Sequence, residues 1–316
     1  MPPRPIIIDT DPGQDDAIAI LLALACPDEI ELLGITAVAG NVPLALTARN
    51  ARVICDLAGR PDIAVHAGCD RPLQRDLITA ENVHGRSGLD GLDPQQLAAP
   101  ACPLSPVPAV DFLIDTLRAR PAGTVTLCPI GPLTNIATAL LRAPDIAGRI
   151  GQIVMMGGGF FQPGNITPVS EFNIHVDPEA AAIVLGAGVD LVMMPLDVTH
   201  QALVTPDRHA RFAALSSPAG RAVAALTGHF DRYDPDRHGP DAAPLHDPCT
   251  IAYLLAPHLF SGRRINVTVE TGSELTRGMT VADWWRVTDR PANALFIRDL
   301  DAAGFFDLLT DRLARL

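Results

Sequence analysis

Lysine is absent from this 316-residue sequence, in which all 24 basic residues are arginine. The absence excludes Schiff-base catalysis and the phosphate-binding lysine of P-loop proteins and of many phosphotransferases. Basic residues are also outnumbered, because the formal net charge is -12. We therefore expect neither a nucleic acid polymer nor an acidic membrane surface as a partner.

Membrane and secretion signals are absent as well. The sequence has no uninterrupted apolar run of about 18 residues, the length that spans a bilayer. The first stretch lacks the charged and apolar regions of a secretory signal peptide. The six cysteines form no CxxC pair and no framework spacing, which favours reduced, buried thiols. These absences predict a cytoplasmic protein without a membrane partner.

Aromatic residues are scarce at 4%, whereas hydrophobic residues reach 48%, so the core consists mainly of Ala, Leu, Val and Ile. Strand-like and helix-like segments alternate along the chain. The predicted strands are 6–8, 31–38, 63–67, 125–130, 152–156, 190–194 and 265–270. The predicted helices are 15–25, 45–58, 110–118, 133–141, 178–186, 218–230, 248–255 and 302–316. This alternation predicts one α/β domain over residues 1–316, with an open, doubly wound, mostly parallel sheet of about eight or more strands.

The densest group of carboxylates directly follows the first predicted strand, Ile6–Ile8. Asp9, Asp11, Asp15 and Asp16 fall within eight positions. Any one of them has an ordinary interpretation as a cap at the helix start. Four together repel by about 1 kcal/mol or more per pair, a conflict that a bound cation would remove. Oxygen ligands favour Ca²⁺ or Mg²⁺ over zinc.

Other polar residues follow later strands, at the sheet edge where ligands bind in such folds. They are Asn41, Asn135, Asn165, Glu171, Asn173, His246 and Asp247. Each has an ordinary alternative. Asn135 and Asp247 could be helix caps, Asn165 could be a turn residue, and Glu171 could be a solvated charge.

Six motifs together resemble the nucleoside hydrolase family of the inosine-uridine preferring type. They are Asp9-Thr-Asp11-Pro-Gly-Gln-Asp15-Asp16-Ala17, Val38-Ala-Gly-Asn41, Gly131-Pro-Leu-Thr-Asn135, Met156-Gly-Gly-Gly159, Glu171-Phe-Asn173 and His246-Asp-Pro-Cys249. The resemblance covers nearly the whole chain in the same order. It implies hydrolysis of the N-glycosidic bond of ribonucleosides to ribose and free base.

The resemblance also implies a cofactor, Ca²⁺. The ion would be held by Asp11, Asp16 and Asp247 and by the backbone carbonyl of Ile130, and would complete its shell with a water and ribose hydroxyls. Asp9 is similar to a supporting carboxylate beside these ligands.

Roles for further residues follow from the same resemblance. Asp15 matches the general base that takes a proton from water. His246 matches a histidine near the leaving base, and His84 matches a second histidine on a mobile loop. The residues that match ribose-binding positions are Asn41, Asn165, Glu171 and Asn173.

Base preference is expected to depend on residues 230–245. Purine-tolerant relatives carry several tyrosines there, whereas this chain has only Tyr233. The segments 243–252 and 278–283 are similar to those of pyrimidine-specific ribonucleoside hydrolases. We therefore expect uridine and cytidine as substrates, in nucleoside catabolism and pyrimidine salvage, and, by family analogy, a homotetramer or dimer.

Three alternatives stay open at this point. One is a purine-tolerant inosine-uridine hydrolase. Another is a haloacid dehalogenase-like phosphohydrolase, because Ile-Ile-Ile-Asp9-x-Asp11 resembles its first motif, although the missing lysine argues against that chemistry. The third is a non-catalytic nucleoside- or Ca²⁺-binding protein, which would not need Asp15.

Overall fold

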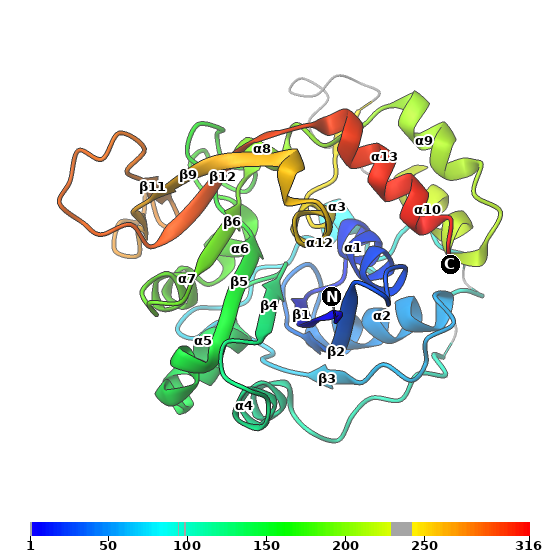
Figure 1. The fold of residues 1–316 in the computed structure, drawn as a ribbon, viewed down its shortest axis with the longest axis horizontal. Coiled ribbons are helices and arrows are strands. Elements are labelled where there is room, and N and C mark those ends of the chain that lie inside the picture. Colours follow the sequence, from blue (N-terminus) through cyan, green and yellow to red (C-terminus); the bar gives the residue numbers. More distant parts are fainter. Residues whose placement is uncertain (1, 94, 98, 229–241) are drawn as a thin grey trace.

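An eight-stranded sheet runs through the computed structural model, which describes residues 2–93, 95–97, 99–228 and 242–316 (Figure 1). The strand order is β3-β2-β1-β4-β5-β6-β12-β9. The bounds are β1 Arg4–Thr10, β2 Ile30–Ala37, β3 Val65–Ala67, β4 Val125–Pro129, β5 Ile150–Met156, β6 Leu191–Met194, β9 Phe260–Ile265 and β12 Ala294–Leu300. Only the pair β12/β9 is antiparallel among the neighbours in this sheet. The predicted doubly wound, mostly parallel α/β sheet is confirmed.

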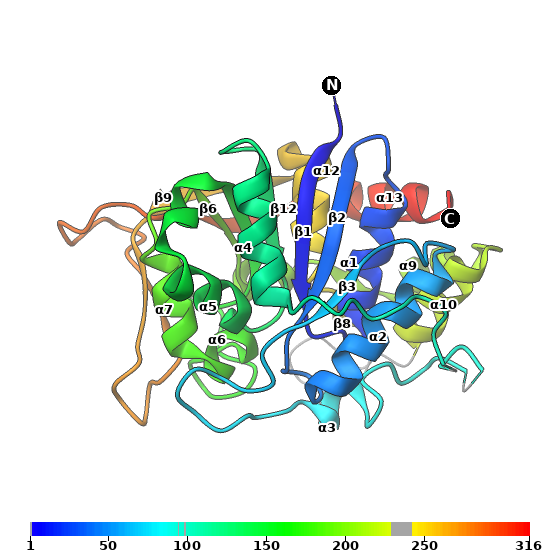
Figure 2. The same ribbon diagram turned by 90° about the horizontal axis from the view of Figure 1, so that it is seen from below.

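Helices cover both faces of the sheet, and each set packs on its own hydrophobic core (Figures 1 and 2). One face carries α1 Gln14–Leu24, α2 Leu44–Leu57, α9 Pro206–Ala213, α10 Pro218–Gly228, α12 Pro248–Leu255 and α13 Ala302–Leu313. The other carries α4 Ala109–Ala119, α5 Thr134–Arg142, α7 Pro178–Leu185 and the 3-10 helix η1 Pro144–Arg149. No helix in the described part of the chain is long and apolar enough to cross a membrane.

Strand β1 lies at the middle of this architecture and is buried on both faces. Ile6 and Ile8 belong to one core and Ile7 to the other, as the alternation of side chains along a strand requires. Burying each of these side chains stabilises the fold by about 1.5–3 kcal/mol. The chain continues from β1 to β2 on one side and later returns to β4 on the other. The order of strands therefore reverses between β1 and β4, and ligands of such sheets bind beyond the carboxyl ends of the strands at this switch point.

The last part of the sheet differs from the sequence prediction. The predicted strand 265–270 corresponds to β10 Val267–Val269, which pairs with β11 Thr280–Ala282 in a separate two-stranded sheet and does not join the main sheet. Strand β9, which ends at Ile265, was not predicted. Strand β12 was not predicted. The middle of β9, Ser-Gly-Arg-Arg, is exposed at the sheet edge, so it lacks the apolar run of a buried strand.

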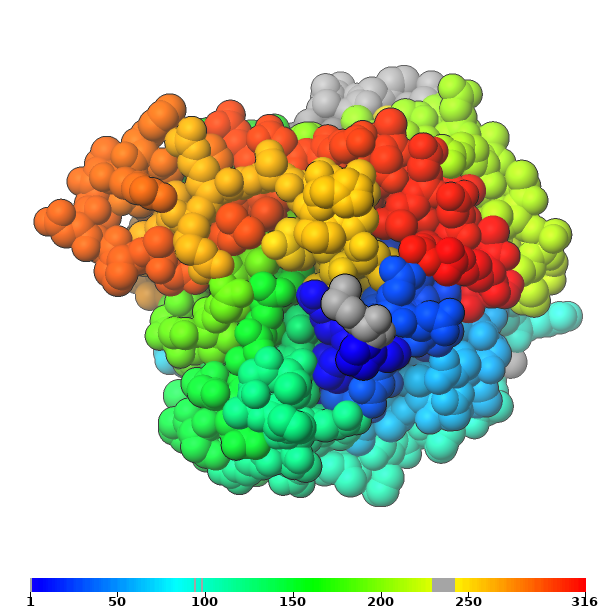
Figure 3. Space-filling view, viewed as in Figure 1, coloured from blue at the N-terminus to red at the C-terminus, as the bar shows by residue number. Residues whose placement is uncertain are grey.

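Short elements make up the rest of the secondary structure among the described residues. They are α3 Glu81–His84, α6 Phe172–Val176, α8 Leu196–Thr199, β7 Leu203–Val204, β8 Ala243–Pro244 and the 3-10 helix η2 Pro257–Leu259. Helix α3 lies between the predicted strand 63–67 and the predicted helix 110–118. It lies at the end of the molecule opposite the N-terminus of β1 (Figure 2). The orange segment around β10 and β11 projects from the body (Figure 3).

Candidate active site

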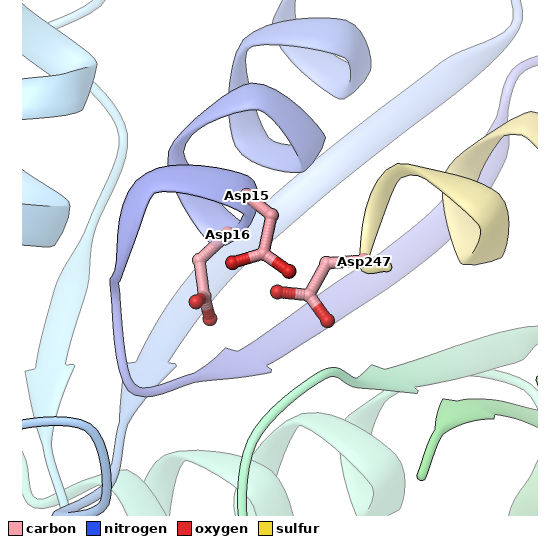
Figure 4. A group of neighbouring side chains, drawn as sticks. All are labelled: Asp15, Asp16 and Asp247. Atoms are coloured by element: carbon pink, nitrogen blue, oxygen red, sulfur yellow. The ribbon is translucent and has the colours of Figure 1, made fainter. Parts of the chain in front are cut away.

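Three carboxylates from two distant parts of the chain meet beyond the end of β1. Asp15 and Asp16 lie in the first turn of α1, and Asp247 directly precedes α12 (Figure 4). One carboxylate oxygen from each lies within 4.8 Å of the others, and all three side chains are buried. The sequence separation shows why Asp247 is not found by local spacing: packing of α1 against α12 brings it here.

Asp16 is both a helix cap and a member of this group. Its Oδ2 accepts hydrogen bonds from the Gly13 N–H at 2.9 Å and from Asn41 Nδ2 at 3.3 Å, and its Oδ1 accepts from the Thr10 hydroxyl. Burial and the neighbouring Asp15 raise the pKa of Asp16 to about 6, while the Thr10 and Gly13 hydrogen bonds oppose the rise. The ordinary cap interpretation is thus correct for Asp16 but incomplete.

Asp11 lies in a closely fitted space between two glycines. Its Oδ2 accepts from the Asn41 N–H at 2.7 Å, while its buried Oδ1 has no hydrogen-bond partner within the described residues. A Cβ atom at Gly40 would lie 2.0 Å from the Asp11 carboxylate, and one at Gly131 would lie 2.3 Å from it. Burial, and then the charges of Asp16 and Asp15, raise the pKa of Asp11 well above its usual range.

Asp247 occupies the N-cap position of α12, but its side chain makes no capping hydrogen bond. The cap interpretation is therefore wrong for this side chain. Burial raises the pKa of Asp247 well above its usual range, and the charges of Asp15, Asp16 and Asp11 add to the shift. A buried carboxylate beside three others is costly unless a positive charge offsets it.

Asp9 lies on β1, two residues before Asp11, and is also buried. Its Oδ1 accepts from the Thr36 hydroxyl and from Asn135 Nδ2 at 2.8 Å, while its buried Oδ2 has no partner in the described part of the chain. Burial raises the pKa of Asp9 to about 7 against these two hydrogen bonds. Asn135 also donates to the Ala37 carbonyl, so it ties β1 to β2 and does not cap α5.

Sequence reasoning did not identify Thr10 and Thr36 as supports of the carboxylates. Thr10 is the last residue of β1, and Thr36 lies one residue before the end of β2. A polar residue at the carboxyl end of a buried strand was the available signal, because such side chains face the ligand edge of the sheet.

This donor set fits a hard cation. The carboxylates are buried, one Asp11 oxygen has no hydrogen-bond partner among the described residues, and burial together with mutual repulsion raises the pKa of Asp11. A bound cation would offset each of these costs. The Ile130 carbonyl accepts from Asn173 Nδ2 at 2.9 Å. A carbonyl oxygen has a second lone pair, so that bond is compatible with an additional role.

Glu171 and Asn173 lie at the start of α6 and are buried. Glu171 accepts from the N–H groups of Asn173, Gly158 and Ile174 at 2.9, 2.9 and 3.2 Å. Burial raises the pKa of Glu171 to about 7, with Asp15 adding to the rise. The alternative of a solvated charge is wrong for Glu171.

Asn165 serves the turn that precedes this helix. Its side-chain oxygen accepts from the Phe172 N–H at 2.9 Å, and the residue is exposed. The turn interpretation therefore agrees with its contacts.

Histidines lie on two other segments. His246 Nδ1 lies 2.8 Å from the Thr199 hydroxyl, and its ring is 5.6 Å from that of His200. His84 ends α3, and its Nδ1 lies 2.6 Å from Gln14 Oε1. Tyr233 lies outside the described residues.

This chain is similar in sequence to known proteins. The family model of the inosine-uridine preferring nucleoside hydrolase matches residues 6–307. The chain is 55% identical to an uncharacterized protein of Schizosaccharomyces pombe over 98% of this chain and 99% of that one. It is 47% identical to the pyrimidine-specific ribonucleoside hydrolase RihA of Shewanella sp. (strain ANA-3), over 98% of this chain and 96% of the relative.

The fold is also similar to that of solved structures. A plant nucleoside hydrolase superposes with a TM-score of 0.91 at 32% identity, over 99% of both chains. The purine-preferring ribonucleoside hydrolase of Gardnerella vaginalis superposes with a TM-score of 0.90 at 33% identity, over 98% of both chains. The chain therefore belongs to the inosine-uridine preferring nucleoside hydrolase family and is an N-glycosyl hydrolase that acts on ribonucleosides.

Proposed function

We propose that this ribonucleoside hydrolase depends on Ca²⁺ and prefers the pyrimidine nucleosides uridine and cytidine. The observation that carries the metal proposal is the convergence of buried Asp15, Asp16 and Asp247 within 4.8 Å. Without a cation, these charges would oppose folding.

Asp11, Asp16 and Asp247, with the Ile130 carbonyl, are proposed to hold the ion. An all-oxygen donor set of this kind suits Ca²⁺. When bound, Ca²⁺ supplies positive charge that offsets the carboxylates and acidifies a neighbouring water. Asp9 keeps its place behind these residues through Thr36 and Asn135.

Asp15 is proposed to be the general base. It accepts a proton from water as that water attacks the anomeric carbon of ribose, and the C–N bond to the base breaks. The surrounding negative field stabilises the positive charge that develops on the sugar. The residues proposed to bind ribose are Asn41, Asn165, Glu171 and Asn173.

The leaving base takes electrons from the broken bond and needs a proton or hydrogen bond. His246 is proposed to serve it, because it precedes the ligand Asp247 and is oriented by Thr199. His84 is proposed to contact the substrate from α3, and Tyr233 to contact the base.

Pyrimidine preference is supported by the relative named pyrimidine-specific at 47% identity. The runner-up is a purine-tolerant enzyme, for which the purine-preferring structure at 33% identity is the supporting observation. Family membership removes the haloacid dehalogenase-like alternative.

The test is ribose release from uridine, cytidine and inosine by purified protein, with metal content measured on the same sample. The expected order in kcat/KM is uridine and cytidine above inosine, with activity lost on chelation and restored by Ca²⁺. A higher kcat/KM for inosine would overturn the pyrimidine preference, and full activity after complete metal removal would overturn the Ca²⁺ dependence. p-Nitrophenyl phosphate is the negative control.

A single domain, a cytoplasmic location and assembly into a dimer or tetramer are further proposals. Exposed apolar side chains gather on the projecting segment, where Leu275, Trp285 and Val287 are 85%, 74% and 83% exposed. Such side chains are often covered by another protein surface. Sedimentation velocity of the purified protein tests the assembly.

A further inference from the structure

The side chain of Gln14 joins the first turn of α1 to the segment that carries His84. Its Oε1 lies 2.6 Å from His84 Nδ1. Its Nε2 donates to the backbone carbonyls of His84 and Asp90, each at 3.4 Å. Gln14 is buried and immediately precedes Asp15, so one amide connects the catalytic turn with the 84–90 segment.

This contact pattern fixes the position of a proton. Carbonyl oxygens only accept hydrogen bonds, so the NH₂ group of Gln14 must face the carbonyls of His84 and Asp90. The amide oxygen then faces the imidazole and cannot donate. His84 Nδ1 must therefore carry the hydrogen, and in the neutral ring Nε2 is left as an acceptor.

The imidazole also fits tightly against the turn. A Cβ atom at Gly13 would lie 2.4 Å from His84 Nδ1, so the ring packs where only a glycine leaves space. Asn50 adds a second link, because its Nδ2 donates to the carbonyls of Pro12 at 3.1 Å and Ser87 at 2.8 Å. The 84–90 segment and the 12–16 turn are thus held together at two points.

We propose that Gln14 is a positioning residue for substrate binding, which holds His84 as the Nδ1–H tautomer so that Nε2 accepts a hydrogen bond from a hydroxyl group of the nucleoside. The inference rests on the proposed contact of His84 with substrate. It adds which partner donates the hydrogen bond: the substrate hydroxyl donates and His84 Nε2 accepts. A carbonyl oxygen of the base could not donate and would be repelled.

The first test is the tautomer itself, which needs no substrate. Protein labelled with ¹⁵N-histidine is studied by ¹H–¹⁵N correlation at about pH 8, where an ordinary histidine is neutral. The His84 signal is assigned by its loss in His84→Ala. Wild type and Gln14→Glu, which keeps an acceptor, should give the Nδ1–H pattern, whereas Gln14→Met should lose it. An Nε2–H pattern in the wild type would overturn the proposal.

The second test is kinetic. Gln14→Met should lower kcat/KM for uridine about tenfold, mainly through KM, because the lost hydrogen bond serves binding. In the His84→Ala background the same substitution should change kcat/KM less than about twofold, because the two residues act as one unit. Additive effects of the two substitutions would overturn the proposal. The matched control is Gln152→Met, near the N-terminal end of β5, where the Gln152 side chain donates to Asp190. This variant should retain the kcat and KM of the wild type.

Failure of the proposed function has a different signature. If His84→Ala hydrolyses uridine as fast as the wild type, the proposed contact of His84 with substrate is wrong, even where the wild type shows the Nδ1–H tautomer. If His84→Ala lowers kcat/KM for uridine but Gln14→Met does not, only the positioning role of Gln14 is wrong.

Discussion

The carboxylate side and the histidine side of the site are held in different ways. Three of the carboxylates accept from backbone N–H groups: Asp16 from Gly13, Asp11 from Asn41 and Glu171 from Gly158. The histidines instead contact side chains, Thr199 for His246 and Gln14 for His84. The path of the main chain after each strand fixes the backbone donors, whereas a single substitution can remove a side-chain partner. The comparison suggests that the chemistry is built into the fold and that base recognition is added by replaceable contacts.

Replacing the proposed base should have the largest effect. Asp15→Asn should lower kcat by about 10²–10⁴-fold, because general-base catalysis contributes on that scale. Its metal content, measured by mass spectrometry after dialysis against Ca²⁺, should remain that of the wild type. The matched variant Asp11→Asn should lose both metal and activity. Loss of metal in Asp15→Asn would make Asp15 a ligand, an outcome that its place among the converging carboxylates makes worth measuring.

Replacing His246 should separate leaving-group assistance from the rest of the chemistry. His246→Gln should lower kcat/KM for uridine by about 10²-fold, the lower end of acid–base effects. A ribose derivative with p-nitrophenol as leaving group needs little assistance, so its hydrolysis should fall much less. Equal losses with both substrates would show that His246 does not serve the leaving base. Steady-state kinetics with the two substrates give the answer.

Removing the metal with a chelator should make the free energy of unfolding depend on pH, because the buried carboxylates then lack a neutralising cation. In the metal-free protein the pKa values are raised to about 6 for Asp16 and about 7 for Asp9 and Glu171, from about 4 when unfolded. The folded state then binds more protons than the unfolded state between these values. Its free energy of unfolding therefore falls as pH rises from about 4 to about 7.

Thermal unfolding with chelator or with Ca²⁺ at pH values from about 5 to about 8 measures this effect. The Tm of the chelated protein should fall from about pH 5 to about pH 7, and the gain in Tm from Ca²⁺ should grow over the same interval, because protons and the cation compete for the same carboxylates. In Asp11→Asn the gain from Ca²⁺ should shrink at every pH. A Tm of the chelated protein that stays level or rises would contradict the raised pKa values.

Much of the carboxylate side could be predicted from the sequence because its signals are local. Ile6–Ile8 followed by Asp9 to Asp16 predicts strand, turn and helix, and the structure has them there. The sheet class followed from the alternation of segments. Strand β9 could not be found, because the exposed residues Ser-Gly-Arg-Arg interrupt its apolar pattern at the sheet edge. Strand β12 was also missed, although its first four residues are apolar.

Supporting contacts could not be predicted, because they join residues far apart in the chain. Asn135 looked like a cap, and only the packing of β1, β2 and α5 brings it to Asp9. The side chain of Asp247 also looked like a cap and makes no capping bond. Gln14 gave no signal beyond its place beside Asp15, because its partner His84 reaches it through the fold.

Removing the support behind Asp9 should have the smallest effect on chemistry and a measurable one on stability. Asn135 is fully buried, donates to Asp9 and Ala37, and accepts from the Cys69 N–H at 2.8 Å. Asn135→Ala should lower the free energy of unfolding by about 1–3 kcal/mol, because buried partners are left unsatisfied. Asn266→Ala, which removes a hydrogen bond at a half-buried surface position, should stay within about 0.5 kcal/mol of the wild type. Urea unfolding with Ca²⁺ present gives both values, and kcat for uridine should fall by less than about tenfold in Asn135→Ala, since no proposed metal ligand or base is changed. A loss as large as that of Asp15→Asn would place Asn135 in the chemistry, and would end the distinction between the residues that react and those that hold them.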